Sequence, residues 1–377
     1  MNLKKLFRFR FSVYLSYRKA SKYLLWLWIL INKSIRKRKP YRVKLVAIAK
    51  NEACYLPEWL AHHQYFGFDH ISVYVNNTTD NTSNIVRKLS SVKHIEFCDG
   101  DEYFQPDINV PQTQVYKHEL NRSKKQGYSH VMFLDIDEFW TPKDLKTTIH
   151  DFLKQKTTDV VCFEWLNRTN ENHPFLPSID KKIVGIKGNH VKSLVSTNVL
   201  VEDVNPHSIL GYKIKHQLAD GSIYHVDKNN FAKISREEVK SPLKEIFILH
   251  RMFRSQEEYV ALLLRGRPIQ NRPYADVFKT NRSGYIPRTS KVSISFESEV
   301  LIDYQWFLEN FFANYKLHEE IMLGREFVMG KREQVSRVIL DSPPEVFPIL
   351  SKIFTRVTLP DVVAAMETKK SKCELND

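Results

Sequence analysis

The feature of this sequence that most constrains its fold is a series of four short apolar runs, each followed by polar residues. The runs occupy residues 43–50, 70–77, 94–99 and 130–135, and helical patterns lie between them. Apolar strands that alternate with helices are typical of an α/β domain built on a parallel sheet. From Gln256 onward the pattern is mainly helical, notably over Glu299–Phe327, so we expect a helical C-terminal appendage packed on the α/β part.

Charge divides the chain into a tail and a body. Residues 1–42 hold 13 Lys or Arg and no Asp or Glu, whereas the remainder holds 44 basic and 43 acidic residues. The net charge of +14 therefore belongs to the tail, and nucleic-acid binding becomes a weak explanation for it. We predict three segments: a basic aromatic tail over 1–42, an α/β domain over 43–255 and a helical region over 256–377.

The tail has the composition of a membrane-surface segment. An apolar stretch at Tyr23–Ile31 contains Trp26 and Trp28, and the basic run Arg36–Lys39 would face anionic lipid. No uncharged run in the chain exceeds ten residues, whereas a membrane-spanning helix needs about 20. We expect a cytoplasmic protein held peripherally on the cytoplasmic face of a membrane. The alternative is a solvated, partly disordered arm.

Polar side chains stand at the carboxyl ends of the predicted strands, where ligands bind in such sheets. Asn51 and Glu52 follow the first strand, Asn77 ends the second and Asp135 ends the fourth. Asp135 and Asp137 are two residues apart, so in extended geometry both carboxylates point to the same side. Such a pair suits Mg²⁺ or Mn²⁺, which keep open positions for diphosphate oxygens. The alternative is an ordinary acidic turn.

Absent motifs narrow the chemistry further. The chain has no GxGxxG, GxxxxGK[ST], HExxH or GxSxG pattern, which disfavours dinucleotide enzymes, P-loop NTPases, zincins and α/β-hydrolases. Four dispersed cysteines without a CxxC pair indicate neither a disulfide framework nor a structural zinc site. Glycosylation sequons at Asn76, Asn77 and Asn81 share one loop, where glycans would obstruct a site, and this disfavours a secretory lumen.

Four segments, in this order, resemble glycosyltransferases of family 92 and the family 2-like group: AIAKNEACYLPEWLAHHQYFG, VYVNNTTDNT, QTQVYKHEL and MFLDIDEFW. A later segment resembles the family's histidine-containing element, ILHRMFRSQEEYVALLLRGR, and the resemblance covers roughly residues 43–267. It implies a GT-A fold, with a Rossmann-like sheet that binds a nucleotide-diphospho-sugar. The implied activity is metal-dependent transfer, with inversion, from a UDP-sugar to a glycan or lipid-linked acceptor in surface polysaccharide or lipopolysaccharide synthesis.

The resemblance also implies roles for individual residues. Nucleotide contacts are implied for Asn51, Glu52, Asn77 and Asp80, and Gln112 would line the donor pocket. The metal, Mn²⁺ or Mg²⁺, would be held by Asp135, Asp137 and His250. Two positions depart from the family pattern. Val75 stands where many relatives have an acidic residue, and Arg251 follows His250 where Tyr is usual.

The catalytic base is not identified by any motif. Inverting transfer needs a carboxylate opposite the leaving diphosphate, by analogy with inverting glycosidases. Asp203 and Asp227 are the candidates, with Asp203 preferred because Glu202-Asp203 resembles the acidic pair of GT-A enzymes; a solvated loop carboxylate is the alternative for both. Trp140 and Trp165 would either stack on sugar rings or belong to the core. Three histidines stay open between structural and functional roles: His62, His63 and His207.

Two other functions remain open. The segment VMFLDIDEF also resembles the motif of haloacid-dehalogenase-type phosphatases, in which Asp135 would be the nucleophile. About 90 residues of α/β pattern precede this motif, and Phe139 stands where that family has Thr or Val, so the transferase is favoured. A non-catalytic membrane-surface adaptor would use the tail, but it leaves the polar residues at the strand ends unexplained.

Overall fold

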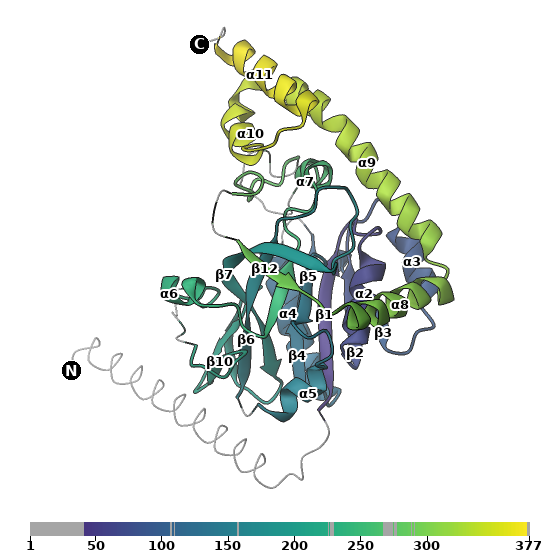
Figure 1. Ribbon diagram of the computed structural model, residues 1–377, viewed down its shortest axis with the longest axis vertical. Coiled ribbons are helices and arrows are strands. Elements are labelled where there is room, and N and C mark those ends of the chain that lie inside the picture. The colour runs from purple at the N-terminus through teal and green to yellow at the C-terminus, as the bar shows by residue number, and fades with distance from the viewer. Residues whose placement is uncertain are drawn as a thin grey trace, which may run out of the picture.

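A computed structural model describes residues 41–105, 108, 110–156, 158–224, 226, 230–266, 274, 277–287, 289 and 291–374. Figure 1 shows a central sheet with helices on both faces and a group of C-terminal helices beyond one end of it. The predicted tail lies outside the described residues except for Tyr41 and Arg42. No helix in the described part of the chain is long and apolar enough to cross a membrane.

Among the described residues, ten strands form one sheet. Its order is β3-β2-β1-β4-β7-β6-β11-β5, with β10 beside β6 and β12 beside β7. The strands are β1 (Val43–Ala49), β2 (His70–Val75), β3 (Ile95–Asp99), β4 (His130–Phe133), β5 (Glu138–Pro142), β6 (Val160–Arg168), β7 (Lys182–Ser196), β10 (His216–Leu218), β11 (Ile246–His250) and β12 (Val292–Ser295). A separate pair is formed by β8 (Val201–Val204) and β9 (Ile209–Gly211).

The helices lie around this sheet and beyond its end. They are α2 (Leu56–Tyr65), α3 (Thr82–Leu89), α4 (Pro111–Lys125), α5 (Ile149–Lys154), α6 (Arg236–Lys240), α7 (Gln256–Leu263), α8 (Ser298–Asn314), α9 (His318–Asp341), α10 (Phe347–Ile353) and α11 (Pro360–Glu374). Short 3₁₀ turns occupy Asp101–Tyr103 and Pro344–Val346. The α/β class predicted from the sequence, with helices at the C-terminus, is confirmed. The sheet is mainly parallel, with β7 and β5 antiparallel to the strands beside them, and it agrees with the GT-A-like fold that the resemblance implies.

Strand β1 shows how the sheet separates two cores. Leu45 and Ala47 are fully buried in the core that includes α2 and α8, whereas Val46 is buried in the core that includes α4. Successive side chains of a strand point to opposite faces, so an uninterrupted apolar run fits a strand covered on both sides. The apolar run predicted at 43–50 therefore has the expected central position.

Two predicted elements differ from the structure. The helical pattern over Glu299–Phe327 is divided between α8 and α9, because the chain turns at Lys316, whose φ is +55°. The polar segment from Lys369, whose sequence favours a frayed end, continues α11 as far as Glu374, because Val362 and Ala365 pack in a C-terminal core with α9 and α10. A helix end held by apolar contacts forms in spite of a polar sequence.

Candidate functional site

The carboxyl ends of five strands meet at one edge of the sheet. β1 runs parallel to β2 and β4, and β6 runs parallel to β11. Because β7 is antiparallel to both β4 and β6, all five of these strands point the same way. The residues at their ends are Asn51, Asn77, Asp135, Asn167 and His250. The strand-end site predicted from the sequence thus has its residues along one edge.

The loops after β1 and β2 are held by a network of internal hydrogen bonds. Asn51 has a left-handed backbone, with φ of +54°, and its Oδ1 accepts from the backbone N–H groups of Thr79 at 2.6 Å and Asp80 at 3.3 Å. The carboxylate of Asp80 accepts from the Ala53 N–H at 2.9 Å and from both the N–H and the hydroxyl of Thr82. Both oxygens of Asp80 are therefore used within the chain, which makes Asp80 a residue that shapes the loop.

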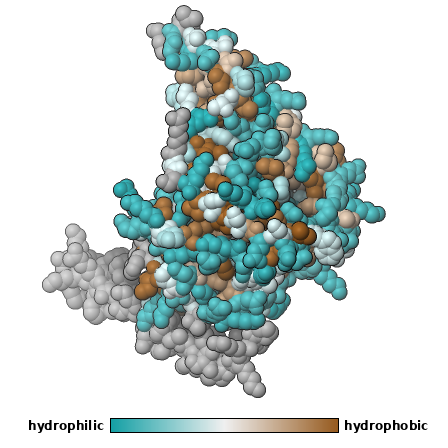
Figure 2. Space-filling model, in the orientation of Figure 1, coloured by the Kyte–Doolittle hydropathy of each residue, from teal (hydrophilic) through white to brown (hydrophobic). Residues whose placement is uncertain are grey.

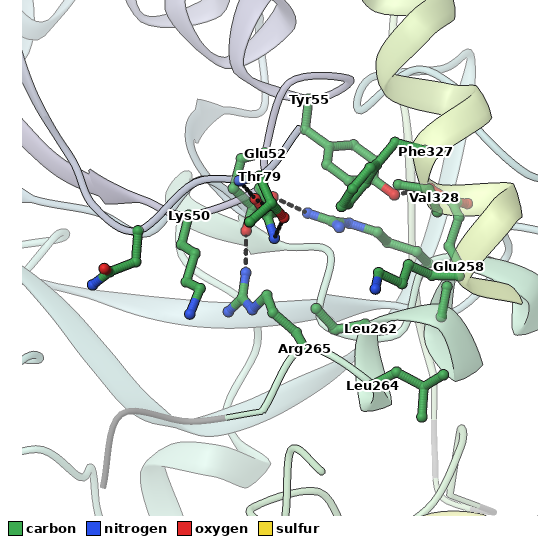
Figure 3. A pocket seen from close by; sticks show the side chains of 15 residues that line it. Lys50, Glu52, Tyr55, Thr79, Glu258, Leu262, Leu264, Arg265, Phe327 and Val328 are labelled. Atoms are coloured by element: carbon green, nitrogen blue, oxygen red, sulfur yellow. Dashed lines mark hydrogen bonds and ion pairs between the residues drawn. The ribbon is translucent and has the colours of Figure 1, made fainter. Parts of the chain in front are cut away.

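A pocket of about 770 Å³, partly open to solvent, lies beside this network. Figure 3 shows Arg265 directed at Glu52, with Lys50 on one side and Phe327 of α9 on the other. The pocket is lined by Lys50, Asn51, Glu52, Tyr55, Asn77, Thr79, Arg254, Glu258, Ala261, Leu262, Leu264, Arg265, Phe327, Val328 and Lys331. Three residues of the predicted donor set share this lining, Asn51, Glu52 and Asn77, and the C-terminal region completes it.

Cations outnumber acids around this pocket. Glu52 is 7% exposed and forms ion pairs with Arg265 and, at 3.5 Å, with Arg254. Burial and the charge of Arg265 lower the pKa of Lys50. Burial and the charges of Arg265 and Arg282 hold the pKa of Lys279 well below its ordinary value. The lining itself holds four basic side chains, Lys50, Arg254, Arg265 and Lys331, and two acidic ones, Glu52 and Glu258.

Asp137 and His250 face each other at this edge. The Nε2 atom of His250 lies 3.5 Å from Oδ2 of Asp137, and Nδ1 of the same ring is 3.0 Å from Oδ1 of Asn167. Although burial opposes it, the neighbouring charges of His250, Arg254 and Arg282 hold the pKa of Asp137 well below its ordinary value. The backbone fixes this turn, since the N–H of Arg251 donates to the carbonyl of Asp137 at 2.8 Å.

Asp135 has different surroundings, although it is only two residues away. Its Oδ2 accepts from the ammonium of Lys192 at 3.0 Å, and its Oδ1 accepts from Gln112 at 3.2 Å. Lys192 is fully buried and also pairs with Glu138 at 2.9 Å. Gln112 is thereby placed beside Asp135, and it is not among the residues that line the pocket described above. Both oxygens of Asp135 have partners within the chain, and its side chain is 42% exposed, against 17% for Asp137.

The donor set at Asp137 and His250 fits a hard divalent cation with few protein ligands. A carboxylate oxygen and an imidazole nitrogen 3.5 Å apart can bind one ion from adjacent positions. The described residues contain no group of three or more His, Cys, Asp or Glu side chains arranged around an ion. Mg²⁺ and Mn²⁺ sites of this kind use one or two protein ligands and fill the other positions with water and substrate phosphate.

The other sequence candidates lie apart from these groups. Asp203 is exposed on β8, and no interaction between it and Asp137 or His250 is found among the described residues. Asp227, the second candidate base, lies outside the described residues. Trp140 is fully buried, and the carbonyl of this residue lies 3.0 Å from His62, so both are core residues. His63 is also fully buried, 2.8 Å from the Trp59 carbonyl.

The basic residues of the site were not identified from the sequence. Lys192 lies in a strand, where an isolated lysine gives no signal of burial. Arg254 and Arg265 lie within the quoted segment ILHRMFRSQEEYVALLLRGR, and their spacing on either side of one short helix was the available signal. Arg251, noted as a departure from the family pattern, is buried and pairs with Glu171. It therefore has a structural ion pair and leaves the His250 geometry intact.

Residues 46–191 match the model of glycosyltransferase family 92. The matched segment runs from β1 into β7 and contains Asn51, Asp135 and Asp137. The resemblance stated from the sequence is confirmed, and the protein is a glycosyl transfer enzyme. His250 and the cations at Arg254, Arg265 and Arg282 lie beyond the matched residues.

Solved structures give a weaker comparison. S. aureus TarS 1–349 in complex with UDP is 11% identical, with 89% of this chain and 92% of that chain covered and a TM-score of 0.29. The galactosyltransferase LgtC in complex with donor and acceptor sugar analogs is 15% identical, with 41% and 58% covered and a TM-score of 0.24. At this level of similarity, neither structure indicates a role for any residue of this chain. No curated protein matches the sequence.

Proposed function

We propose that this glycosyltransferase uses a nucleotide-diphosphate sugar, with UDP as the nucleotide, and needs Mn²⁺ or Mg²⁺. The observation that carries the proposal is the excess of buried cations beside Asp137. Arg282 is 8% exposed, its closest acidic partner is Asp137 at 3.9 Å, and its Nε has no hydrogen-bond partner among the described residues. Buried guanidinium groups are normally fully paired, so this arrangement favours a bound anion with several oxygens.

A diphosphate fits this set of charges. Lys50, Arg254, Arg265, Lys279 and Arg282 surround the acids Glu52 and Asp137. A leaving nucleoside diphosphate gathers negative charge as the bond to the sugar breaks, and fixed cations stabilise that charge. Asp137 and His250 would hold the metal, which would neutralise the leaving group without a proton transfer. The polar pocket between β1, β2 and α9 would take the nucleoside.

The residues of the chain have separate tasks in the proposed reaction. Arg265 and Arg282 bind the phosphate oxygens, and Asn77 and Thr79 line the space for the nucleoside. Asp135 holds Gln112 and Lys192 in place beside the donor. An acceptor hydroxyl oxygen then forms a bond to the anomeric carbon while the bond from that carbon to the diphosphate oxygen breaks. The hydroxyl proton passes to a general base, for which Asp227 is the remaining candidate from the sequence. A direct displacement of this kind inverts the anomeric centre.

The contacts of Asp135 also bear on the phosphatase alternative. A nucleophilic carboxylate needs one free oxygen directed at phosphorus. In this structure Lys192 and Gln112 occupy both oxygens of Asp135, at 3.0 and 3.2 Å. We therefore expect no hydrolysis of simple phosphate esters and no phosphate bound covalently to Asp135.

A panel of nucleotide sugars tests the proposed function. Thermal unfolding is measured with UDP-, GDP-, TDP- and CMP-sugars, each with and without Mn²⁺, because a ligand that binds only the folded state raises its stability. We expect UDP-sugars to raise the midpoint in the presence of Mn²⁺ only, and Asp137→Asn to abolish that increase. The proposal fails if no nucleotide sugar stabilises the protein, or if stabilisation by UDP-sugars is equal in excess EDTA.

A further inference from the structure

A group of aromatic rings lies beside His250 and is not used by the donor site. Trp165 of β6 has its ring centre 4.3 Å from that of His250, 5.1 Å from His190 and 5.2 Å from His207. The rings of His190 and His207 are 4.7 Å apart. We call Trp165, His190 and His207 the indole cluster. All three side chains are partly exposed, so the cluster is a surface and not part of the sealed core.

A β-bulge places Trp165 in this position. The register between β6 and β7 shifts between Glu164 and Leu166, so that Trp165 falls at the irregularity. Bulges turn side chains out of the regular alternation and are common beside active sites. Gly188 on β7 makes room for the bulge, because an added Cβ there would lie 3.0 Å from the Cβ of Trp165. The placement of the indole therefore depends on two local features of the backbone.

The cluster combines an indole ring with two imidazole rings. The indole Nε1 of Trp165 is buried and has no hydrogen-bond partner among the described residues. Nδ1 of His207 is 3.1 Å from the carbonyl of Val191, which fixes the proton on Nδ1 and leaves Nε2 as an acceptor. Burial lowers the pKa of His190 to about 4, so this ring is neutral near pH 7. A neutral imidazole offers one donor and one acceptor.

We propose that the indole cluster is the binding site for a pyranose ring of the acceptor. The proposal rests on the proposed function, since it needs the diphosphate to lie at Asp137 and His250. A pyranose has an apolar C–H face and a rim of hydroxyl groups, which match an indole face bordered by neutral imidazoles. His250 contacts both Asp137 and Trp165, so a sugar on the indole would lie next to the diphosphate site. The nucleoside pocket at Lys50 and Asn77 is lined by other residues.

Binding of simple sugars tests this site separately from the donor site. Saturation-transfer NMR is recorded with methyl glycosides of glucose, galactose, mannose and N-acetylglucosamine, in the presence of UDP and Mn²⁺. We expect at least one glycoside to bind the unmodified protein, and Trp165→Ala to weaken that binding at least fivefold. The matched control is Trp306→Ala, because Trp306 is 69% exposed on α8 and should leave binding unchanged.

Two further measurements distinguish the possible outcomes. The increase in melting temperature on addition of UDP is recorded for the unmodified protein and for every variant. If UDP does not raise the melting temperature of the unmodified protein, the proposed function itself is refuted. If Trp165→Ala does not fold, His190→Ala and Trp165→Phe replace it, with at least threefold weaker binding expected for the first and near-normal binding for the second. Normal glycoside binding by His190→Ala and Trp165→Ala, or no glycoside binding by a protein that does bind UDP, would overturn the proposal. A rise in KM for the UDP-sugar with unchanged glycoside binding would also overturn it, because the ring would then belong to the donor.

Discussion

The polar side chains at the two ends of the strand edge differ in how fully their hydrogen bonds are satisfied within the chain. At the β1–β2 end, Asn51 and Asp80 direct their side-chain oxygens at backbone N–H groups and threonine hydroxyls of the same loops. At the β11 end, Arg254 and Arg282 are buried, and each has an Nε with no hydrogen-bond partner among the described residues. Buried polar groups are usually satisfied, so the loops at the first end are held by their own hydrogen bonds, whereas the second end keeps guanidinium nitrogens that a bound anion could satisfy.

The same contrast separates the two carboxylates of the DxD turn. Asp135 pairs with the buried Lys192, a cation that the chain itself supplies, whereas Asp137 faces His250 at 3.5 Å and Arg282 at 3.9 Å. Two aspartates that are equivalent in the sequence therefore have different surroundings. The proposed function gives metal binding to Asp137, which faces an imidazole, and a positioning role to Asp135, which is held by Lys192 and Gln112. Figure 2 shows the polar and charged residues that cover most of one face of the molecule, with apolar residues gathered near its centre.

The largest effect is expected from Asp137→Asn, which removes a charge and keeps the side-chain volume. Transfer should fall by more than about 100-fold, because removing a group that stabilises charge in the transition state typically costs 10²–10³ in rate. Initial rates at saturating UDP-sugar and Mn²⁺ give the measurement. Asp341→Asn, an exposed carboxylate near the end of α9, is the control. Activity within threefold of the unmodified enzyme would refute the metal-binding role.

Arg282→Met should separate binding from stability. Loss of a charged hydrogen bond to phosphate weakens UDP binding by about tenfold or more, since such bonds contribute roughly 1.5–3 kcal/mol. The same change removes a positive charge beside Lys279, so the melting temperature should rise or stay constant. Calorimetric titration with UDP and thermal unfolding provide the two values, and Arg337→Met on the surface of α9 is the control. Unchanged UDP affinity would show that Arg282 is not part of the donor site.

Asp80→Ala should lower the stability of the protein more than its affinity for UDP. The substitution removes the acceptor of four hydrogen bonds, donated by the N–H of Ala53, the hydroxyl of Thr78 and the N–H and hydroxyl of Thr82. The free energy of unfolding should therefore fall by about 2–4 kcal/mol. UDP affinity of the folded protein should change less than in Arg282→Met. Urea unfolding measures the stability, and Asp80→Asn, which keeps one acceptor oxygen, should give an intermediate value. A large loss of UDP affinity at normal stability would place Asp80 in direct contact with the nucleotide.

The smallest effect on catalysis is expected from deletion of residues 1–42. Binding to anionic vesicles should be lost, and for the full chain it should weaken with salt, because the Debye length falls from about 10 Å at 0.1 M to about 3 Å at 1 M. Turnover on a short soluble acceptor should stay within twofold. Equal vesicle binding by the truncated protein would refute a membrane-surface role for the tail.

The sequence predicted which residues lie at the strand ends better than it predicted the ion pairs among them. Asn51 and Asp135 could be found because apolar runs end directly before or at them, and parallel strands bring such positions together. Lys192 could not be found, because its partners Asp135 and Glu138 lie more than 50 residues away and meet it only through antiparallel pairing of β4 and β7. Arg254 and Arg265 had their spacing around α7 as a signal, whereas Arg282 depends on the chain returning to the edge from the helical region, which no local pattern indicates.

The most direct test of the assignment is the binding of Mn²⁺ followed by electron paramagnetic resonance, in which the signal of free Mn²⁺ decreases as the ion is bound. The titration compares the unmodified protein, Asp135→Asn and Asp137→Asn, each with UDP present. We predict that the unmodified protein and Asp135→Asn bind Mn²⁺ with affinities within about tenfold of each other, and that Asp137→Asn leaves the ion free. Retained binding in Asp137→Asn together with loss in Asp135→Asn would contradict the division of roles between the two carboxylates.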